Sequence, residues 1–506
     1  MDGFYKKGNN KVRRCTHVMV KRGITINTVF ATMGVVALMI TCIILGDKSN
    51  YMLNWLGITI YLYAILTWKW ERKESIFSIY TIFFTFFLLF SYGQCVMWAL
   101  GIGLDRGIGT GVLFYRTSII PNESQMITTK WYTCICMLLF HYGAILFSGK
   151  SSVKTTNVVS TKKAQQDREL LYICGCVVTT IVVPLAIYQR VKELLIAQTY
   201  GYKALYYGDL ATQSGYMQIL LFLFFPALLC LLIGSNFKKR VTRAVIIIFL
   251  IYAALGVMSG DRGSWIYSLV ILIWVYAQRK KIRLKEVVFG GIMGVLGLYM
   301  LNVITDMRDT GLDSLSIESF INGFRVEDSP IVDIFFEMGG SMGIITLFLI
   351  VGNSIYPYGN TYVTAILGAI SSRFLSLLGI KQVFISNWFS QEYLGISWGT
   401  GFSMIGEAYV NGGFIGGFIY VFIIGIIIGR ILSKCRDRSN IEQNPIGAFV
   451  SIAVLNIVSG LPRSHVYLVI KEFVYGVLII LLMVWLLRQI QHRRPTSIQV
   501  DKGGSS

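Results

Sequence analysis

The sequence predicts an all-α integral membrane protein with about twelve transmembrane helices. Of its 506 residues, 54% are apolar and only 14% are charged, a balance outside the range of ordinary soluble domains. The apolar residues gather in runs of about 20, the length at which a helix crosses the hydrocarbon core with its own backbone hydrogen bonds satisfied. The basic start is followed by a long apolar run without a small-residue cleavage site, which predicts a retained first span rather than a signal peptide.

Twelve apolar runs are candidate spans. They lie at residues 23–45, 51–69, 76–100, 128–148, 169–188, 214–234, 244–259, 263–278, 287–304, 404–429, 446–461 and 467–487. Two more apolar stretches, 341–356 and 361–380, would raise the number to fourteen. Because they form a pair, they would leave the orientation of every other span unchanged. We expect them instead to lie on the outer surface or to dip into it.

The basic residues predict the orientation of the spans. If the N-terminus is cytoplasmic, the loops and helix ends on that side hold 32 of the 46 Lys and Arg residues. This excess recurs at successive loops, as the positive-inside rule requires. The net charge of +20 is therefore explained by topology, and we expect no nucleic acid as a partner. Both termini are predicted to be cytoplasmic.

This map divides the chain into five segments. They are a basic cytoplasmic N-terminus (1–22), spans one to nine (23–304), a large external loop (305–402), spans ten to twelve (403–488) and a cytoplasmic tail (489–506). The external loop is far longer than the others, and loops of that length are usually functional or disordered. Because it is rich in apolar and aromatic residues, we expect short amphipathic or re-entrant helices in it.

Asp261 and Arg262, within "GDRG", fall at the predicted external turn between spans seven and eight. The flanking Gly260 and Gly263 fit a simple polar turn. A turn does not require Arg, however, and the charge bias disfavours one on this side. An Arg next to glycines suits the bidentate binding of phosphate or pyrophosphate. Asp261 would then orient the Arg or act as a base.

A second ionisable cluster, "LPRSHVYLVIKE", precedes and enters the last span. The spacing of Arg463, Tyr467 and Lys471 predicts one helical stripe that runs into the membrane. His465 and Glu472 would share a neighbouring face. Ionisable residues at this depth indicate a functional site because an unpaired charge in the membrane is costly. An internal salt bridge of Lys471 or Glu472 is the alternative interpretation.

A third polar stripe enters the tenth span from the same side. Ser403, Glu407 and Asn411 follow one another at intervals of four residues. Glu407 has no basic neighbour in the sequence, so we expect a cation of the first two clusters to pair with it. The glycine pairs that follow, up to Gly425 and Gly429, predict close packing between helices.

Several motifs are missing from the sequence. It has no Walker A loop, no HExxH motif and no closely spaced DxD pair, so nucleotide-driven transport and nucleotide-sugar transfer lose support. Two CxC pairs, at 134–136 and 174–176, would point to different faces of their helices. We therefore expect no metal site.

Taken together, these features resemble the Wzy-type polymerases of bacterial O-antigen and capsular polysaccharide. The resemblance rests on the number of spans, the single large external loop, and the motifs "GDRG", "GEAYVNGGFIGG" and "LPRSH". It implies a GT-C-like glycosyltransferase of the bacterial cytoplasmic (inner) membrane. Such an enzyme moves a growing glycan from undecaprenyl pyrophosphate onto a sugar hydroxyl of the next lipid-linked repeat unit, at the outer face.

The resemblance also implies roles for the basic clusters. Arg262 and Arg463 would bind the pyrophosphate and stabilise the negative charge that grows on it as it departs. Three further residues would support substrate binding: Lys471, Arg373 and Tyr467. Arg373 lies in an apolar stretch of the long loop.

Glu407, Asp261 and His465 are the candidates for the base that deprotonates the attacking hydroxyl, and the sequence does not rank them. Neither a metal nor a cofactor is needed if cations carry the phosphate charge. The implied partners are undecaprenyl-pyrophosphate-linked oligosaccharides, membrane lipids, a chain-length regulator and a flippase. A lipid-linked oligosaccharide flippase, an O-antigen ligase and a nonenzymatic membrane protein remain alternative interpretations, although the long loop and the lack of two related halves disfavour a flippase.

Overall fold

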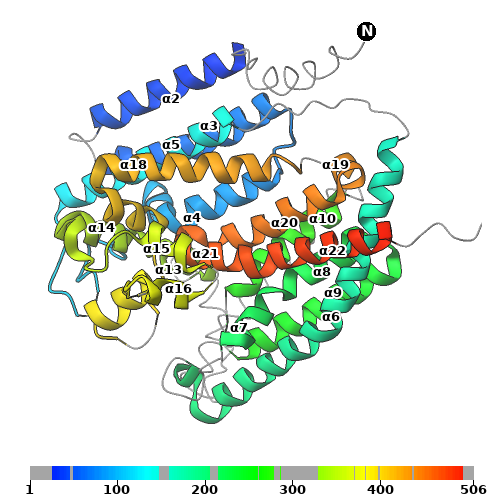
Figure 1. Ribbon diagram of the computed structural model, residues 1–506. Helices are drawn as coiled ribbons and strands as arrows, with labels where there is room; N and C mark the ends of the chain where they lie inside the picture. The colour runs from blue at the N-terminus through cyan, green and yellow to red at the C-terminus, as the bar shows by residue number, and fades with distance from the viewer. Residues whose placement is uncertain are drawn as a thin grey trace, which may run out of the picture.

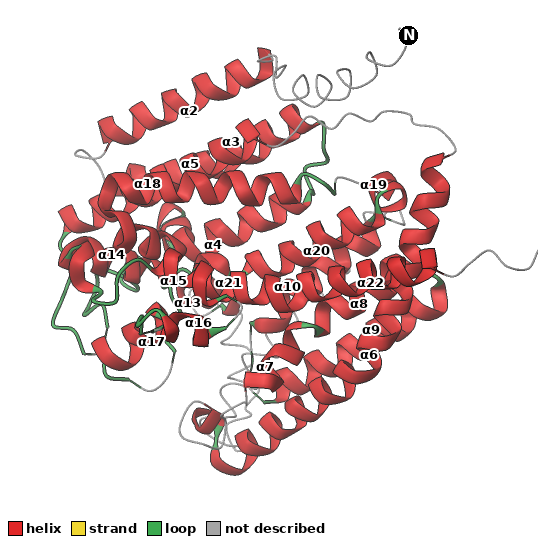
Figure 2. Ribbon diagram, viewed as in Figure 1, coloured by secondary structure: helices red, strands yellow, loops and turns green. Residues whose placement is uncertain are grey.

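A computed structural model describes most of the chain and shows a bundle of helices (Figure 2). It describes residues 26–45, 50–114, 116–147, 159–205, 215–259, 261, 263–278, 285, 329–369, 371–381, 383–396, 399–435 and 438–493. All regular secondary structure within these ranges is helical, and nine helical segments there are long and apolar enough to cross a membrane. The prediction of an all-α, multi-pass membrane protein is therefore confirmed.

The long helices form the body of the bundle. They are α2 (Ile26–Leu45), α3 (Asn50–Arg72), α4 (Ile79–Ala99), α5 (Glu123–Phe147), α6 (Val159–Tyr200), α7 (Gly215–Phe222) with α8 (Phe224–Gly234), α9 (Lys239–Met258), α10 (Ser264–Ala277), α18 (Met404–Leu432), α20 (Pro445–Ser459) and α21 (Val466–Glu472) continued by η6 (Phe473–Leu478) and α22 (Ile479–Arg493).

The shorter elements lie between them. They are η1 (Tyr202–Leu205), α13 (Pro330–Met338), α14 (Ser341–Val351), η3 (Asn353–Ile355), α15 (Thr361–Gly368), α16 (Ser372–Leu377), α17 (Ile385–Asn387), η4 (Trp388–Tyr393), α19 (Arg438–Gln443) and η5 (Leu461–Arg463). Figure 1 shows α13 to α17 gathered at one end of the bundle and α19 at the other.

Eleven of the twelve predicted spans coincide with a helix of the structure, and the remaining one, 287–304, lies outside the described residues. The region predicted as a loop contains one further segment, Ile331–Val351, that is long and apolar enough to cross a membrane. The stretch 361–380 is broken into α15 and α16. The position of the loop relative to the membrane stays a prediction.

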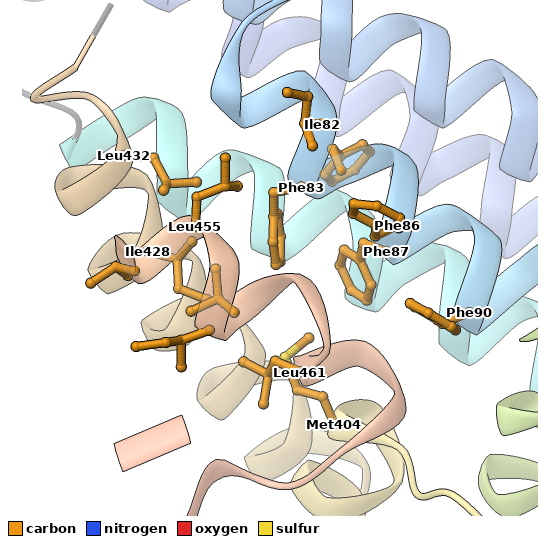
Figure 3. Close-up of a cluster of buried hydrophobic side chains, with 14 of the residues drawn as sticks. Ile82, Phe83, Phe86, Phe87, Phe90, Met404, Ile428, Leu432, Leu455 and Leu461 are labelled. Atoms are coloured by element: carbon orange, nitrogen blue, oxygen red, sulfur yellow. The ribbon is translucent and has the colours of Figure 1, made fainter. Parts of the chain in front are cut away.

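Helix α4 is the centre of the core. In its apolar stretch 78% of the residues are buried, whereas the share of buried residues in the apolar stretch of α9 is 22%. Figure 3 shows the α4 side chains of Phe83, Phe86, Phe87 and Phe90 beside apolar side chains of α18 and α20. The ring of Phe140 on α5 lies 5.1 Å from both Phe83 and Phe87. Because α4 is covered on several sides, its residues are apolar around the whole helix.

Helices α5 and α18 pack with their backbones in contact. A Cβ atom at Gly425 would clash with the backbone oxygen of Phe140, and one at Gly429 would lie 2.5 Å from the Cβ of Ala144. The predicted role of this glycine pair in close packing is therefore confirmed. The sequence did not reveal a kink at Gly413, whose φ of 62° and ψ of −155° interrupt the helical backbone of α18.

The contacts between segments agree with the predicted alternation of spans. Segments expected on the cytoplasmic side meet each other: Asp167 pairs with Arg488, and Arg168 donates a hydrogen bond to the backbone oxygen of Glu442. Segments expected on the external side also meet, since the backbone N–H of Phe402 donates to the backbone oxygen of Arg463 at 3.0 Å. Which end faces the outside stays a prediction.

Candidate functional site

A pocket of about 410 Å³ lies where α10, α13, α20 and α21 meet, at the end of the bundle that carries α13 to α17. Its lining combines apolar and polar side chains: Gly263, Tyr267, Met338, Asn456, Ile457, Gly460, Leu461, Arg463, Ser464, Leu468, Val469 and Glu472. The volume is within the range of about 300–1,000 Å³ that is typical of ligand sites. Two of the three sequence clusters therefore contribute to one cavity.

Arg463 is the cation of this pocket. It ends the 3₁₀ turn η5 and is partly exposed. Its Nη1 donates to the Sδ of Met338 at 3.0 Å, and among the residues the structure describes no carboxylate forms an ion pair with it. A thioether is a weak acceptor, whereas a guanidinium has five N–H donors. Arg463 therefore retains donors for an anionic ligand.

The prediction that Arg463 shares a helical stripe with Tyr467 and Lys471 is wrong, because Arg463 does not belong to the same helix. The backbone is extended at Ser464 and at His465, which separates η5 from α21. The Tyr467 hydroxyl donates to the backbone oxygen of Gly368 at 3.3 Å, and the Lys471 Nζ donates to Oε1 of Gln218 on α7 at 3.4 Å.

Other residues of α21 face Arg463. Glu472 lines the pocket together with Leu468 and Val469. The structure thus brings Arg463 together with Glu472 rather than with Tyr467 and Lys471. The break is caused by the extended residues between η5 and α21, and a count of helical positions cannot detect it.

Glu407 lies fully buried in the first turn of α18. Its Oε1 accepts a hydrogen bond from the Thr361 hydroxyl at 2.7 Å, and its Oε2 accepts one from the backbone N–H of Val466 at 2.8 Å. Both donors are neutral, so neither Arg463 nor Lys471 is the expected cationic partner, and Arg262 lies outside the described residues. Thr361 is the first residue of α15 and Val466 the first of α21. Three helix N-termini therefore converge on this carboxylate, and each favours negative charge.

Asn411 completes this arrangement one turn further along α18. Its Nδ2 donates to the Thr361 Oγ1 at 2.7 Å, and its Oδ1 accepts from the Thr361 backbone N–H at 2.7 Å. Ser403 begins the helix, with its Oγ accepting from the backbone N–H of Gly406. The predicted stripe is thus a continuous hydrogen-bonded unit, but it lies beside the pocket rather than in its lining.

His465 is the third candidate base, and it is buried between η5 and α21 with 8% of its surface exposed. The rings of Phe384, Phe402 and Tyr467 surround it, with centroids 6.2 to 6.5 Å away. Its Nδ1 has no hydrogen-bond partner among the described residues. Burial lowers the pKa of His465 from 6.5 to about 4, so the imidazole is neutral at neutral pH.

Asp261 has a partner that the sequence did not suggest. Its Oδ2 accepts a hydrogen bond from the Nη2 of Arg190 on α6 at 2.9 Å, and its Oδ1 accepts one from the backbone N–H of Gly263 at 3.1 Å. Arg190 also pairs with Glu193 at 2.9 Å. The charged "QRVKE" stretch in an otherwise apolar helix is the sequence signal that could have revealed this cluster.

Two predicted residues remain to be placed. Arg262 lies outside the described residues, although its neighbour Gly263 lines the pocket. Arg373 is exposed on α16 and is not among the described residues that line the pocket. The sequence missed Tyr267 and Asn456, whose only signal is a polar group within an apolar run.

No group of three His, Cys, Asp or Glu side chains within the described ranges is placed to hold a metal ion. A family model described as O-antigen polysaccharide polymerase Wzy matches residues 24–494. This match covers every described helix from α2 to α22. No curated protein and no solved structure matches the chain.

Proposed function

The chain belongs to the Wzy family of O-antigen polysaccharide polymerases, and from this premise we propose that the pocket around Arg463 binds the pyrophosphate of a lipid-linked glycan. Family membership makes the protein a polymerase of the glycosyltransferase type that acts on lipid-linked repeat units. We propose undecaprenyl pyrophosphate as the carrier of the donor glycan. The acceptor is a sugar hydroxyl of the next lipid-linked unit.

The observation that carries this proposal is the guanidinium of Arg463 in the pocket wall, with a thioether as its partner. A cation at a membrane-embedded site is costly unless an anion or a set of acceptors compensates it. The planar fork of Arg matches two oxygens of a phosphate at once. Arg262 lies outside the described residues, but its neighbour Gly263 is in the same lining, so we assign Arg262 to the same pyrophosphate.

The proposed reaction is a single transfer. The acceptor oxygen forms a bond to the anomeric carbon of the donor glycan while the bond from that carbon to the pyrophosphate oxygen breaks. The bonding electrons remain on the leaving pyrophosphate, and the hydroxyl proton passes to a base. Arg463 and Arg262 stabilise the charge that develops on the leaving group, which is the main catalytic contribution expected of fixed cations.

Glu472 is our choice for the base. It is the one carboxylate among the described residues that line the pocket, and a base must reach the proton it removes. Both oxygens of Glu407 already accept hydrogen bonds, and Asp261 is paired with Arg190. Glu407 and Asp261 then act as positioning residues for α21 and for the Gly263 turn.

The proposed location is the outer face of the bacterial cytoplasmic membrane. The pocket opens at the end of the bundle that carries α13 to α17, whereas the basic helix ends lie at the other end. Lys238, Lys239, Arg240 and Arg243 surround the start of α9 there. The positive-inside rule assigns that basic end to the cytoplasm, so the pocket faces outward.

Purified protein in lipid nanodiscs, supplied with undecaprenyl-pyrophosphate-linked repeat units, tests the role of Arg463. The Arg463→Gln variant removes the charge but keeps most of the volume, and we expect it to abolish the polymer ladder on a gel. Arg430→Gln is the matched control, because Arg430 is an exposed Arg at the opposite end of α18. A normal ladder from Arg463→Gln would remove Arg463 from the mechanism.

A cellular test separates the alternatives. A cell that lacks a polymerase should still carry surface glycan with a single repeat unit, whereas the loss of a flippase or a ligase should leave none. A strain complemented with Arg463→Gln should therefore display single units. Absence of all surface glycan in that strain contradicts the proposed reaction.

A further inference from the structure

A second and larger pocket, of about 570 Å³, lies between α3, α4 and α5, and the proposed transfer does not use it. Its lining comes from the start of α3, the end of α4, the following loop and the start of α5: Asn50, Tyr51, Asn54, Trp98, Leu104, Ile108, Gly109, Thr110, Pro121, Glu123, Met126 and Lys130. These helix ends belong to the side of the bundle that also carries the Arg463 pocket.

Lys130 and Asn54 are the most deeply buried polar residues of this second pocket, with 2% and 4% of their surfaces exposed. The Lys130 Nζ donates to the backbone oxygen of Asn50 at 3.3 Å and to the side-chain oxygen of the same residue. The ammonium also lies 5.0 Å from the ring centroid of Trp98. An ammonium has three donors, so a third N–H is left after the two bonds to Asn50.

Asn54, in contrast, lacks a hydrogen-bond donor for its side-chain oxygen, because Oδ1 has no hydrogen-bond partner among the described residues. A buried acceptor without a donor costs about 1–3 kcal/mol. The pocket therefore combines an acceptor that requires a donor with a cation that has a donor to give, and one ligand with hydroxyl groups can satisfy both.

The lining selects against charged ligands of either sign. Lys130 differs from Arg463, whose partner is a thioether, because it already bonds to two oxygens of Asn50 and lies over the ring of Trp98. It therefore has less charge to offer a pyrophosphate beside Glu123, and its ammonium disfavours a metal cation. The Tyr51 and Thr110 hydroxyls add groups that can both donate and accept. Such a mixture suits the adjacent hydroxyl groups of a sugar, each of which is both a donor and an acceptor.

Helix α13 connects this pocket to the Arg463 pocket. Its Phe336 packs edge-on against Trp98, with ring centroids 6.3 Å apart, and its Met338 lines the Arg463 pocket. Arg106 pairs with Asp333 of α13 at 2.6 Å and covers the Phe336 ring. Helix α13, nine residues long, therefore supports a wall residue of one pocket through Phe336 and lines the other through Met338.

We propose that the pocket around Lys130 and Asn54 is a saccharide site that binds a sugar residue of a lipid-linked repeat unit through its hydroxyl groups. This inference rests on the proposed function, because the repeat unit is the substrate whose pyrophosphate would occupy the Arg463 pocket. The sugar site holds the glycan part.

The test is direct binding of oligosaccharide to the full-length protein in nanodiscs. The probe is lipid-free repeat-unit oligosaccharide, released by mild acid from the glycosyl pyrophosphate of the lipid-linked repeat units, and binding is measured by titration calorimetry. Thr110→Trp places a large ring in the pocket from an exposed loop position, where the Thr hydroxyl donates to the nearby backbone oxygen of Gly107. Ser118→Trp is the matched control, because Ser118 is exposed in the same loop and is not part of the lining.

We expect Thr110→Trp to weaken oligosaccharide binding about tenfold or more, which equals the loss of one or two good hydrogen bonds, and Ser118→Trp to bind like the wild type. Lys130→Met, which keeps the chain length but removes the donors, should weaken binding to a similar degree. Unchanged affinity in Thr110→Trp, or displacement of the oligosaccharide by inorganic pyrophosphate, overturns the proposal. Because the binding assay does not depend on catalysis, its result can be interpreted even if the Arg463 test fails.

Discussion

Glu407→Gln is the most informative substitution, because it separates a positioning role from a catalytic one. Glutamine keeps the shape of the side chain but replaces one acceptor oxygen with an NH₂ donor. The two donors that face Glu407 are the Thr361 hydroxyl and the Val466 backbone N–H. In the variant, the remaining oxygen can still accept from Val466, and the Thr361 hydroxyl can turn to accept from the new amide, so what is lost is the negative charge and the added strength that it gives to both hydrogen bonds.

The magnitude follows from the structure. A hydrogen bond to a charged group contributes about 1.5–3 kcal/mol, and a carboxylate at a helix N-terminus contributes about 0.3–1 kcal/mol for each helix. Weakening two hydrogen bonds from charged to neutral costs about 1 kcal/mol each. Losing the charge near three N-termini, at α15, α18 and α21, adds about 0.3–1 kcal/mol each, so the destabilisation is about 3–5 kcal/mol. Asn411 cannot compensate, because its amide is already bonded to Thr361.

Thermal unfolding in detergent micelles, read from tryptophan fluorescence, measures the effect. We expect a clearly lower Tm for Glu407→Gln, with the remaining activity restored at low temperature, where the fold is intact. Glu169→Gln makes the same chemical change at an exposed carboxylate of α6 and serves as the control. A wild-type Tm combined with complete loss of polymer would refute this reasoning and make Glu407 the base.

Three further predictions concern packing, pH and charge pairing. Gly425→Ala should lower the Tm by forcing α18 away from α5 at about 1–3 kcal/mol, whereas Gly416→Ala, with no atom within 4 Å of the added carbon, should not; equal Tm values would contradict the contact. Burial lowers the pKa of His465 to about 4. As the pH falls below 6.5, His465 therefore becomes protonated in the unfolded chain while it stays neutral in the folded protein. Stability should therefore fall between pH 6.5 and 4, and His465→Gln should reduce the slope of Tm against pH. Arg190→Gln and Asp261→Asn should each reduce polymerisation, and the double variant should lose less than their sum; additive losses would show that the pair does not act together.

Most spans could be predicted from the sequence because burial in hydrocarbon requires long apolar runs. Helices such as α4 and α20 can be recognised in the sequence for this reason. The stripe of Ser403, Glu407 and Asn411 was also predictable, since helical spacing alone brings its members to one face. The close contact at Gly425 belongs to the same class, because only small residues let two backbones touch.

The partners of the candidate residues could not be predicted, because they depend on how distant helices pack. Arg190 precedes Asp261 by 71 residues, and Thr361 precedes Glu407 by 46. Arg463 shows a different limit. The i, i+4 spacing assumes an unbroken helix, and the extended residues after η5 remove Arg463 from the stripe. Pro462 in η5 is a local sequence signal of this break.

The contact between Glu407 and Val466 has a consequence for biogenesis. Glu407 enters the membrane with α18, but its second donor is synthesised 59 residues later, with the final span. Until then the carboxylate has only the Thr361 hydroxyl and is held by fewer contacts. The docking of the last span therefore completes the site, so that a nascent chain gains its Arg463 pocket only when insertion is finished.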